Sequence, residues 1–121
     1  MPGLSIIVAG ADGQRFYGAL ETAMAAVALG SPARIFLQGE AVALLREPVS
    51  AGGDLARKAA GLPELGWMIG EAAAMEVALF ACQSGMALVG LTADEMAMQV
   101  RAAGLVSFLR DVGPEDRLLV Y

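Results

Sequence analysis

The residue best suited to chemistry in this sequence is its one cysteine, Cys82, within LFACQSGMALVG at residues 79–90. A thiolate is a strong nucleophile, and a free cysteine has a pKa of about 8.5, so its reactivity depends on groups that stabilise the ionised form. Gln83, Ser84 and Gly85 follow it, where a cysteine that only fills a core is more often followed by further core residues. This turn favours a reactive thiol, but a structural role stays open, because unpaired cysteine is among the most buried residue types.

The sequence contains no histidine, which limits the chemistry that Cys82 can take part in. Without an imidazole base there is neither a Ser-His-Asp triad nor a Cys-His pair. A zinc or copper site is disfavoured too, since histidine and cysteine are the usual ligands of these metals. One cysteine cannot form an internal disulfide. We therefore predict no cofactor and no metal site, and we interpret the seven methionines and Trp67 as core or interface packing residues.

The charge of the chain argues against one broad class of partner. Its 8 lysine and arginine residues stand against 13 aspartate and glutamate residues, giving a formal net charge of -5. Phosphate backbones and anionic lipid surfaces attract basic proteins, so we predict neither nucleic acid nor membrane as a partner. The first residues carry no basic leader, and no apolar stretch reaches the roughly 18 residues of a membrane span. We therefore predict a cytoplasmic protein.

The apolar content is high for a chain of 121 residues, with 57% hydrophobic residues and a mean hydropathy of +0.60. A chain of this length forms one domain with a core of its own but is too short for two, so we predict a single domain over residues 1–121. An apolar content above that of an ordinary domain suggests burial between subunits. We therefore predict a homo-oligomer or an obligate partner.

Four short, nearly continuous apolar runs are typical of strands that are buried on both faces. They cover residues 4–9, 33–38, 76–81 and 116–121. Between the first two runs, apolar side chains recur at helical spacing before Gly30 ends the pattern. These side chains are Phe16, Ala19, Leu20, Ala23 and Val27. The first third of the chain therefore predicts one right-handed βαβ unit.

The middle of the chain predicts shorter helices. One covers residues 39–47, and Asp54 is placed to cap a second over residues 55–61. A third covers residues 63–75, with Pro63 in its first turn. The apolar face of this third helix consists of Leu65, Met68, Ile69 and Ala72. Together these helices lead from the second strand into the third.

The last part of the chain leaves one assignment open. Thr92 and Glu95 form a capping box that starts a helical turn. Residues 97–113 fit either one helix broken at Gly104 or two helical pieces around an extended stretch at 99–101. The order of elements predicts an α/β fold with an open, mainly parallel sheet of four or five strands and helices on both faces, the three-layer arrangement of flavodoxin-like and Rossmann-like proteins.

These elements place Cys82 directly after the third predicted strand. Sites in open parallel sheets lie beyond the carboxyl ends of the strands, and the free amides of residues 83–86 can point toward the sulfur there. A helix terminus stabilises an anion by roughly 0.3–1 kcal/mol, which lowers a thiol pKa by less than about one unit. A larger shift requires a nearby cation, for which Arg15, Arg57 and Lys58 are the candidates.

Three segments taken together resemble a known family. They are RIFLQGEAVALL at 34–45, VALFACQSGMALVGLTADEM at 77–96 and AGLVSFLRDVGPEDRLLVY at 103–121. Their order and spacing resemble the DsrE/DsrF-like family, small α/β proteins of sulfur relay and sulfur oxidation that include the TusD-like carriers. The resemblance spans essentially the whole chain, and its most specific part is the strand, cysteine, short helix and GLTADE sequence.

The resemblance implies a sulfurtransferase-like carrier. In that family the cysteine that matches Cys82 accepts a sulfane sulfur as a persulfide and passes it to a partner thiol, and members assemble as trimers or hexamers. Cys82 is then the catalytic residue, and Gln83, Ser84 and Gly85 surround the bound sulfur. Donor and acceptor proteins are the implied partners.

Two other functions fit the residues. The first is a non-catalytic scaffold or ligand-binding subunit of the same fold, with Cys82 as a core residue. The second is a peroxide-reactive thiol sensor, which the sequence favours less because it offers no second cysteine to resolve a sulfenic acid. Whether Cys82 takes up sulfur separates the carrier from both.

Overall fold

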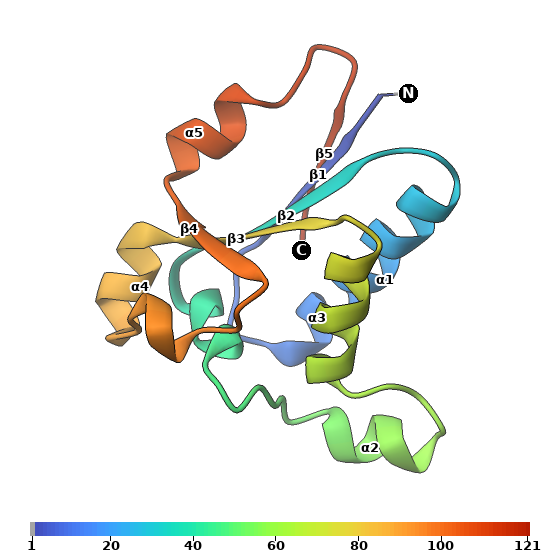
Figure 1. Ribbon diagram of the computed structural model, residues 1–121, viewed down its shortest axis with the longest axis vertical. Coiled ribbons are helices and arrows are strands. Elements are labelled where there is room, and N and C mark those ends of the chain that lie inside the picture. Colours follow the sequence, from blue (N-terminus) through green and yellow to red (C-terminus); the bar gives the residue numbers. More distant parts are fainter. Residues whose placement is uncertain (1) are drawn as a thin grey trace.

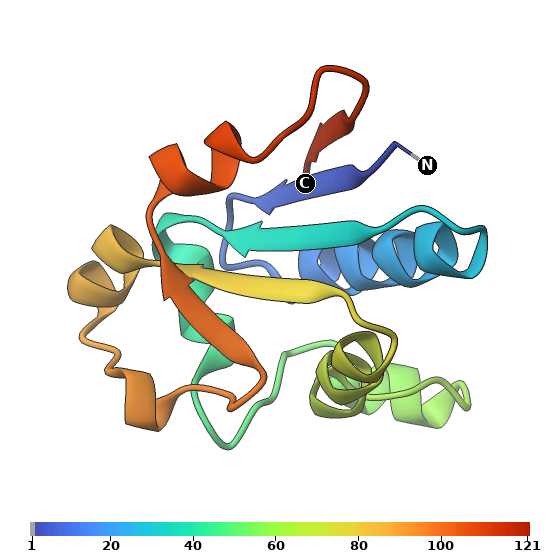
Figure 2. The ribbon, with the colours of Figure 1, turned by 45° about the horizontal axis from the view of Figure 1, so that its top comes forward.

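The strands of the sheet all run in the same direction. The computed structural model describes residues 2–121, and Figures 1 and 2 show how its helices surround the sheet. The strands are β1 (Leu4–Val8), β2 (Ala33–Leu37), β3 (Ala78–Cys82), β4 (Val100–Ala103) and β5 (Arg117–Val120). Their order across the sheet is β4-β3-β2-β1-β5, and each neighbouring pair is parallel. The predicted α/β class with an open parallel sheet is therefore confirmed.

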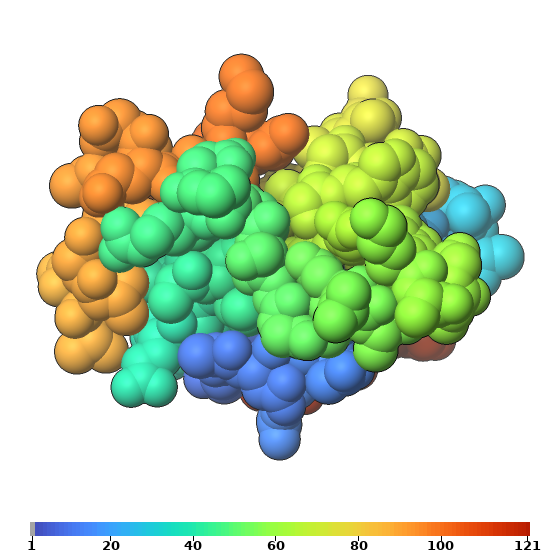
Figure 3. Space-filling model, turned by 90° about the horizontal axis from the view of Figure 1, so that it is seen from below, coloured from blue at the N-terminus to red at the C-terminus, as the bar shows by residue number. Residues whose placement is uncertain are grey.

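Short helices make up most of the connections between the strands. The α-helices are α1 (Gly13–Ala28), α2 (Asp54–Ala59), α3 (Leu65–Ala74), α4 (Gln83–Val89) and α5 (Leu105–Arg110). Two 3-10 helices, η1 (Gly39–Leu45) and η2 (Ala93–Glu95), follow β2 and α4. Seen from below, the segment from η1 to α2 crosses the molecule, with α4 and η2 on one side of it and α3 on the other (Figure 3).

The connections distribute the helices over two faces of the sheet. The steps from β1 to β2, β2 to β3 and β3 to β4 move in one direction, so right-handed crossovers put α1 and α3 on the same face. The return from β4 to β5 runs the other way and puts α5 on the opposite face (Figure 2). There Phe108 packs against Phe36 and Phe80, with ring centroids 5.0 and 5.9 Å apart. Helices on both faces give the predicted three layers.

The main core lies between the sheet and the pair α1 and α3. Asp12 caps α1 by accepting the N–H of Gln14 at 2.9 Å, and the predicted apolar stripe of α1 faces the sheet. The buried members of this stripe are Phe16, Ala19, Leu20 and Ala23, whereas Val27 is only partly buried. The predicted apolar face of α3 is buried at Leu65, Met68, Ile69 and Ala72. The spacing of apolar residues therefore predicts both core-facing surfaces well.

Two boundaries differ from the sequence prediction around β3 and α3. Glu76 has φ +67, which no strand accommodates, so β3 begins at Ala78 and extends to Cys82. The cysteine is thus the last residue of the strand rather than the first residue after it. Pro63 lies before α3, because Glu64 has extended backbone angles and caps a helix that begins at Leu65. These shifts change where side chains point but leave the order of elements as predicted.

The open assignment at residues 97–113 resolves as two pieces. Val100–Ala103 forms β4, which pairs with β3 from Leu79 opposite Val100 to Cys82 opposite Ala103. Gly104 then caps the short helix α5. Pairing along the edge of β3 decides this assignment, and such pairing leaves no periodic signal in a stretch of four residues.

The packing residues predicted from composition divide between core and surface. Met68 and Met96 are buried, while Trp67 is 59% exposed and Met98 is 89% exposed. Trp67 and Met98 are therefore not core residues, and an interface role for them stays a prediction. No helix among residues 2–121 combines the length and apolar character that crossing a membrane requires.

The sequence suggested that Asp54 caps the helix that follows it, but the structure shows a different role for this residue. The N-cap of α2 is Gly53, and α2 begins at Asp54 itself. The Asp54 carboxylate instead accepts the Tyr17 hydroxyl at 2.6 Å and the N–H groups of Leu65 and Ala51 at 2.9 and 3.0 Å. Asp54 therefore ties together α1, the loop before α2 and the start of α3.

We predict that Asp54→Ala lowers the free energy of unfolding by about 2 kcal/mol at neutral pH, because hydrogen bonds to a charged group contribute about 1.5–3 kcal/mol. Burial acts to raise the pKa of Asp54, but the hydrogen bonds from Tyr17, Leu65 and Ala51 outweigh it and hold that pKa below its ordinary value of 3.8. A carboxylate with a lowered pKa stabilises the folded state above its unfolded pKa, and this stabilisation is lost as the pH falls through its folded value.

Urea denaturation across pH measures this effect. The difference between wild type and Asp54→Ala is expected in full above about pH 5 and shrinks below pH 3.8. Asp111→Ala is the matched control, since it removes an exposed carboxylate that pairs with Arg110 at 3.8 Å. An equal loss of stability in both variants would contradict the tying role of Asp54.

Candidate functional site

Cys82 joins the end of a strand to the start of a helix. It is the last residue of β3 and the N-cap of α4, with extended backbone angles. Its Sγ accepts the N–H of Gly85 at 3.4 Å and lies 3.1 Å from Oγ of Ser84. N-cap side chains are usually oxygen acceptors, and a neutral thiol accepts hydrogen bonds only weakly. The N-cap position therefore favours the thiolate over the thiol.

The sulfur is nearly enclosed by its surroundings. The Cys82 side chain is 5% exposed, and Gly85 behind it is buried. Ser84 is exposed, and its Oγ contacts the sulfur, so the buried sulfur lies close to the protein surface on this side.

A further donor to the sulfur comes from the neighbouring strand. Gly39, the first residue of η1, follows β2, and its backbone N–H is the largest of the causes that lower the pKa of Cys82. Its φ of +59 lies in the left-handed region that favours glycine. A Cβ on Gly85 would lie 2.4 Å from the Gly39 carbonyl oxygen, so the two backbones touch directly. Two glycines thus bring η1 within reach of the sulfur.

The pKa of Cys82 lies below the ordinary value of a free cysteine. Burial of the sulfur acts most strongly and raises the pKa, but four hydrogen bonds together outweigh it. The donors are the N–H of Gly39, the Ser84 hydroxyl and the N–H groups of Gly85 and Ser84. None of these donors carries a charge. The thiolate is therefore stabilised by oriented dipoles in a site from which water is largely excluded.

The three cations suggested by the sequence are engaged elsewhere or lie outside this group of donors. The Arg57 guanidinium stacks 4.5 Å from the Tyr17 ring centroid and donates to the Pro63 carbonyl at 2.8 Å. Lys58 is exposed on α2, and Arg15 is exposed on α1 after β1, which β2 separates from β3. None of the three candidate cations is therefore among the groups that lower the pKa of Cys82, and backbone N–H groups and the Ser84 hydroxyl supply the effect.

The three residues predicted around the sulfur differ in what they contact. Ser84 contributes its hydroxyl and its N–H, and Gly85 contributes its N–H. The Gln83 side chain is exposed and reaches toward the end of β4, since a Cβ on Gly104 would lie 3.7 Å from its Oε1. Gln83 therefore lines the surface beside the site rather than the sulfur itself.

Gly39 is the site residue that the sequence prediction missed. It lies 43 positions before Cys82, within a segment that was interpreted only as the start of a short helix. The available signal was a glycine directly after the second strand, whose end adjoins the end of the third strand in an open parallel sheet. Strand order was needed to connect the two.

The arrangement supports nucleophilic chemistry by a thiolate. Residues 2–121 contain no group of three or more Cys, Asp or Glu side chains arranged to hold a metal ion. The sulfur has hydrogen-bond donors on the Gly39 and Gly85 sides and an exposed hydroxyl on the third. This fold and site define a class of small, three-layer α/β proteins with one hydrogen-bonded thiol at the carboxyl edge of a parallel sheet.

The chain belongs to the DsrE/DsrF-like family, whose model matches residues 4–121. The sequence matches no protein with a curated description. Among solved structures, it is similar to the ychN protein from E. coli, with a TM-score of 0.79 and 20% sequence identity over 100% of both chains. It is also similar to MTH1491 from Methanobacterium thermoautotrophicum, a protein of unknown function, with a TM-score of 0.72 and 14% identity over 100% of both chains. At these identities the two structures support the fold.

We predict that Gly85→Ala destabilises the protein and disturbs the thiol site together. The new methyl group would meet the Gly39 carbonyl oxygen at 2.4 Å, and because that atom belongs to the backbone, η1 and α4 must move apart. Overpacking of this kind costs roughly 1–3 kcal/mol. Thermal denaturation measures the cost, and alkylation of Cys82 in the native state reports the accompanying change in exposure.

Gly70→Ala provides the matched control for this prediction. Gly70 lies inside α3, where a Cβ would meet only Nε2 of Gln99, at 3.9 Å, an ordinary contact. Alanine in a helix interior is favoured over glycine by about 0.5–1 kcal/mol, so this variant should be at least as stable as wild type. Equal behaviour of the two variants would show that the contact between Gly39 and Gly85 places no constraint on the fold.

Proposed function

We propose that this protein is a sulfur carrier that holds a sulfane sulfur on Cys82 as a persulfide and passes it to a partner thiol. The observation that carries the proposal is the uncharged set of donors around Sγ, from Gly39, Ser84 and Gly85, which lowers the pKa of the thiol. Membership of the DsrE/DsrF-like family supports a role in sulfur relay. We assign the carrier to the cytoplasm, where reducing conditions keep a single cysteine free.

The proposed transfer needs only the thiolate and two partner thiols. The Cys82 thiolate attacks the outer sulfur of a donor persulfide. A bond forms between that sulfur and Sγ, the bond between the two sulfurs of the donor persulfide breaks, and the donor leaves as a thiolate. In the second step an acceptor thiolate attacks the same outer sulfur, and Cys82 leaves as the thiolate. The electrons balance in each exchange, so no external oxidant or reductant takes part.

The environment of Cys82 suits both steps. The donors that favour the thiolate increase the fraction available for attack at neutral pH. They also make Cys82 a better leaving group in the second step, because a thiol with a lower pKa leaves faster. The chain has no second cysteine to displace the sulfur, so the persulfide persists until another protein's thiol arrives.

We predict that wild-type protein gains the mass of one sulfur atom when it is incubated with a sulfane-sulfur donor such as polysulfide, and that Cys82→Ser gains none. Intact-mass spectrometry measures the added sulfur, and its loss on addition of a small thiol tests the second step. The reason is that Cys82 is the only thiol in the chain.

Alkylation of the native protein distinguishes two results that would contradict this proposal. A Cys82 that is alkylated but takes up no sulfur would overturn the carrier function. A Cys82 that resists both reagents until the protein unfolds would support a structural cysteine in a scaffold subunit, for which its 5% exposure would then be the reason.

We propose further that copies of this chain assemble through the face that α5 covers only in part. In β5, Leu118 is in register with Ser5 and Val120 with Ile7, so both side chains lie on this face. They are 44% and 66% exposed, and β5 is the edge strand of the sheet. Exposed apolar side chains on an edge strand favour association with a second chain, and the mean hydropathy of +0.60 supports the same conclusion.

We predict that the double variant Leu118→Lys/Val120→Lys lowers the oligomeric state, because charged side chains on an edge strand oppose its association. Size-exclusion chromatography with light scattering measures the mass of the assembly. Leu55→Lys is the matched control, since Leu55 is also exposed but lies on α2. A monomeric wild type would contradict the assembly, and an unchanged mass in the double variant would exclude this face.

A further inference from the structure

Two short helices, η1 and α4, lie side by side and start at the same place. η1 begins at Gly39 and α4 begins after Cys82, where the Gly39 backbone meets Gly85. At the far ends, the C-cap residue of η1, Arg46, bonds to the last residues of α4. The two helices therefore run in parallel, with the sulfur at one end of the pair and Arg46 at the other.

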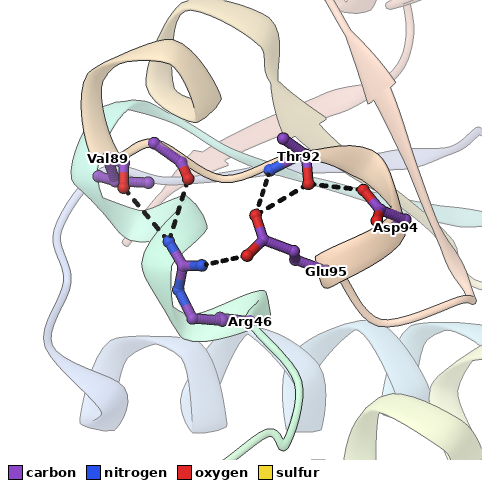
Figure 4. A network of polar contacts seen from close by, with 6 residues as sticks. Arg46, Val89, Thr92, Asp94 and Glu95 are labelled. Atoms are coloured by element: carbon purple, nitrogen blue, oxygen red, sulfur yellow. Dashed lines mark hydrogen bonds and ion pairs between the residues drawn. The ribbon is translucent and has the colours of Figure 1, made fainter.

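Arg46 binds the carboxyl end of α4 through hydrogen bonds. Its Nη2 donates to the carbonyl of Val89 at 3.2 Å and to that of Gly90 at 3.5 Å (Figure 4). The last carbonyls of a helix have no partner within the helix, and a cation there is favourable. The Arg46 side chain is thus a direct link between the end of η1 and the end of α4.

The other arm of the guanidinium is held in place by Glu95. Nη1 of Arg46 lies 3.3 Å from Oε2 of Glu95. Oε1 of Glu95 accepts the N–H of Thr92 at 3.0 Å, which is one half of the capping box that begins η2, and it also accepts the Thr92 hydroxyl at 2.8 Å (Figure 4). Because the capping box fixes Glu95, the carboxylate is already in position to orient Arg46 toward α4.

At the other end of the helix pair, the closest contact is between two residues that have no side chain. Gly39 and Gly85 meet backbone to backbone, so their contact limits how close the helices come but offers nothing to prevent them from sliding. The bond from Gly85 to the sulfur is 3.4 Å long, and hydrogen bonds weaken steeply as their geometry departs from ideal. A small slide of α4 along η1 therefore changes the environment of Cys82.

We propose that Arg46 is a positioning residue for Cys82, which fixes α4 against η1 and so holds the donors of Gly39, Ser84 and Gly85 around the sulfur. It acts from the far end of a seven-residue helix, about 10 Å away. The value of this positioning for sulfur transfer rests on the proposed function. The effect of Arg46 on the hydrogen bonds around the Cys82 sulfur does not depend on that function.

The fold does not depend on this side chain. The backbone bonds from Glu47 N to Glu95 O at 2.8 Å and from Ala97 N to Leu45 O at 2.9 Å join the end of η1 to the residues at and after η2. Arg46 and Glu95 are both substantially exposed, and such surface ion pairs contribute little to stability. Replacing Arg46 therefore removes the link to α4 while the surrounding chain keeps its backbone contacts.

A pH titration of the thiolate by its ultraviolet absorbance tests this role. The absorbance of each variant is corrected by subtracting that of the same variant with Cys82→Ser. This subtraction removes the absorbance change due to tyrosine ionisation. The charged residues on the elements packed against Cys82 are Arg34 on β2, Glu40 on η1 and Arg101 on β4, and all variants retain them. A second readout is the rate of alkylation of the native thiol at pH 7.

Arg46→Ala is expected to raise the apparent pKa of Cys82 and to lower the thiolate fraction at pH 7 about threefold, which corresponds to half a pKa unit. Arg46→Lys should lie between this variant and wild type, because an ammonium group makes a point contact in place of the planar fork. Ser84→Ala, which removes a direct donor to the sulfur, provides the positive reference. Arg110→Ala, which breaks an exposed pair with Asp111, is the negative control.

A titration curve of Arg46→Ala that matches wild type, while Ser84→Ala shifts, would overturn the positioning role. If Arg46→Ala does not fold, Arg46→Lys and Glu95→Gln decide, and unchanged curves for both overturn it equally. Sulfur uptake is measured separately on wild type. Its absence would refute the carrier function and would leave the titration result standing.

Discussion

The direct contact between the backbones of Gly39 and Gly85 is the constraint on which the site depends. It brings the segment after β2 against the first turn of α4, so that N–H groups from two separate connections converge on one sulfur. A Cβ at Gly85 would lie only 2.4 Å from the Gly39 carbonyl oxygen, closer than such contacts allow. The parallel sheet makes this convergence possible, because β2 and β3 are neighbours and end at the same edge.

The two faces of the sheet serve different purposes. On one face, α1 and α3 bury the largest part of the core, and Asp54 connects them by accepting hydrogen bonds from Tyr17 of α1 and Leu65 of α3. On the other face, α5 rests on Phe36 and Phe80 through Phe108, and Arg34 lies 4.1 Å from the Phe108 ring centroid while donating to its carbonyl at 3.0 Å. A single short helix covers little of this face, and the exposed side chains of β5 lie beside it.

Apolar patterning predicted the fold class and most elements, since buried strands and amphipathic helices leave signals over many residues, but it left β4 unassigned. The core faces of α1 and α3 and the capping box of Thr92 and Glu95 follow from local spacing alone. What the sequence could not supply were the long-range pairings. Tyr17 with Asp54, Gly39 with Cys82 and Arg46 with Val89 each join residues more than thirty positions apart, and only the order of the strands brings them together. The position of Cys82 was therefore predictable, but the source of its lowered pKa was not.

A thiolate stabilised by uncharged donors responds differently to its surroundings from one that is paired with a cation. Dissolved salt screens interactions between exposed charges, with a Debye length of about 8 Å at physiological ionic strength, but it has little effect on short hydrogen bonds to a buried sulfur. The donors of Gly39, Ser84 and Gly85 thus make the intrinsic reactivity of Cys82 largely independent of ionic strength. Any salt dependence of its encounters with other proteins comes instead from the acidic surface, which carries the net charge of -5.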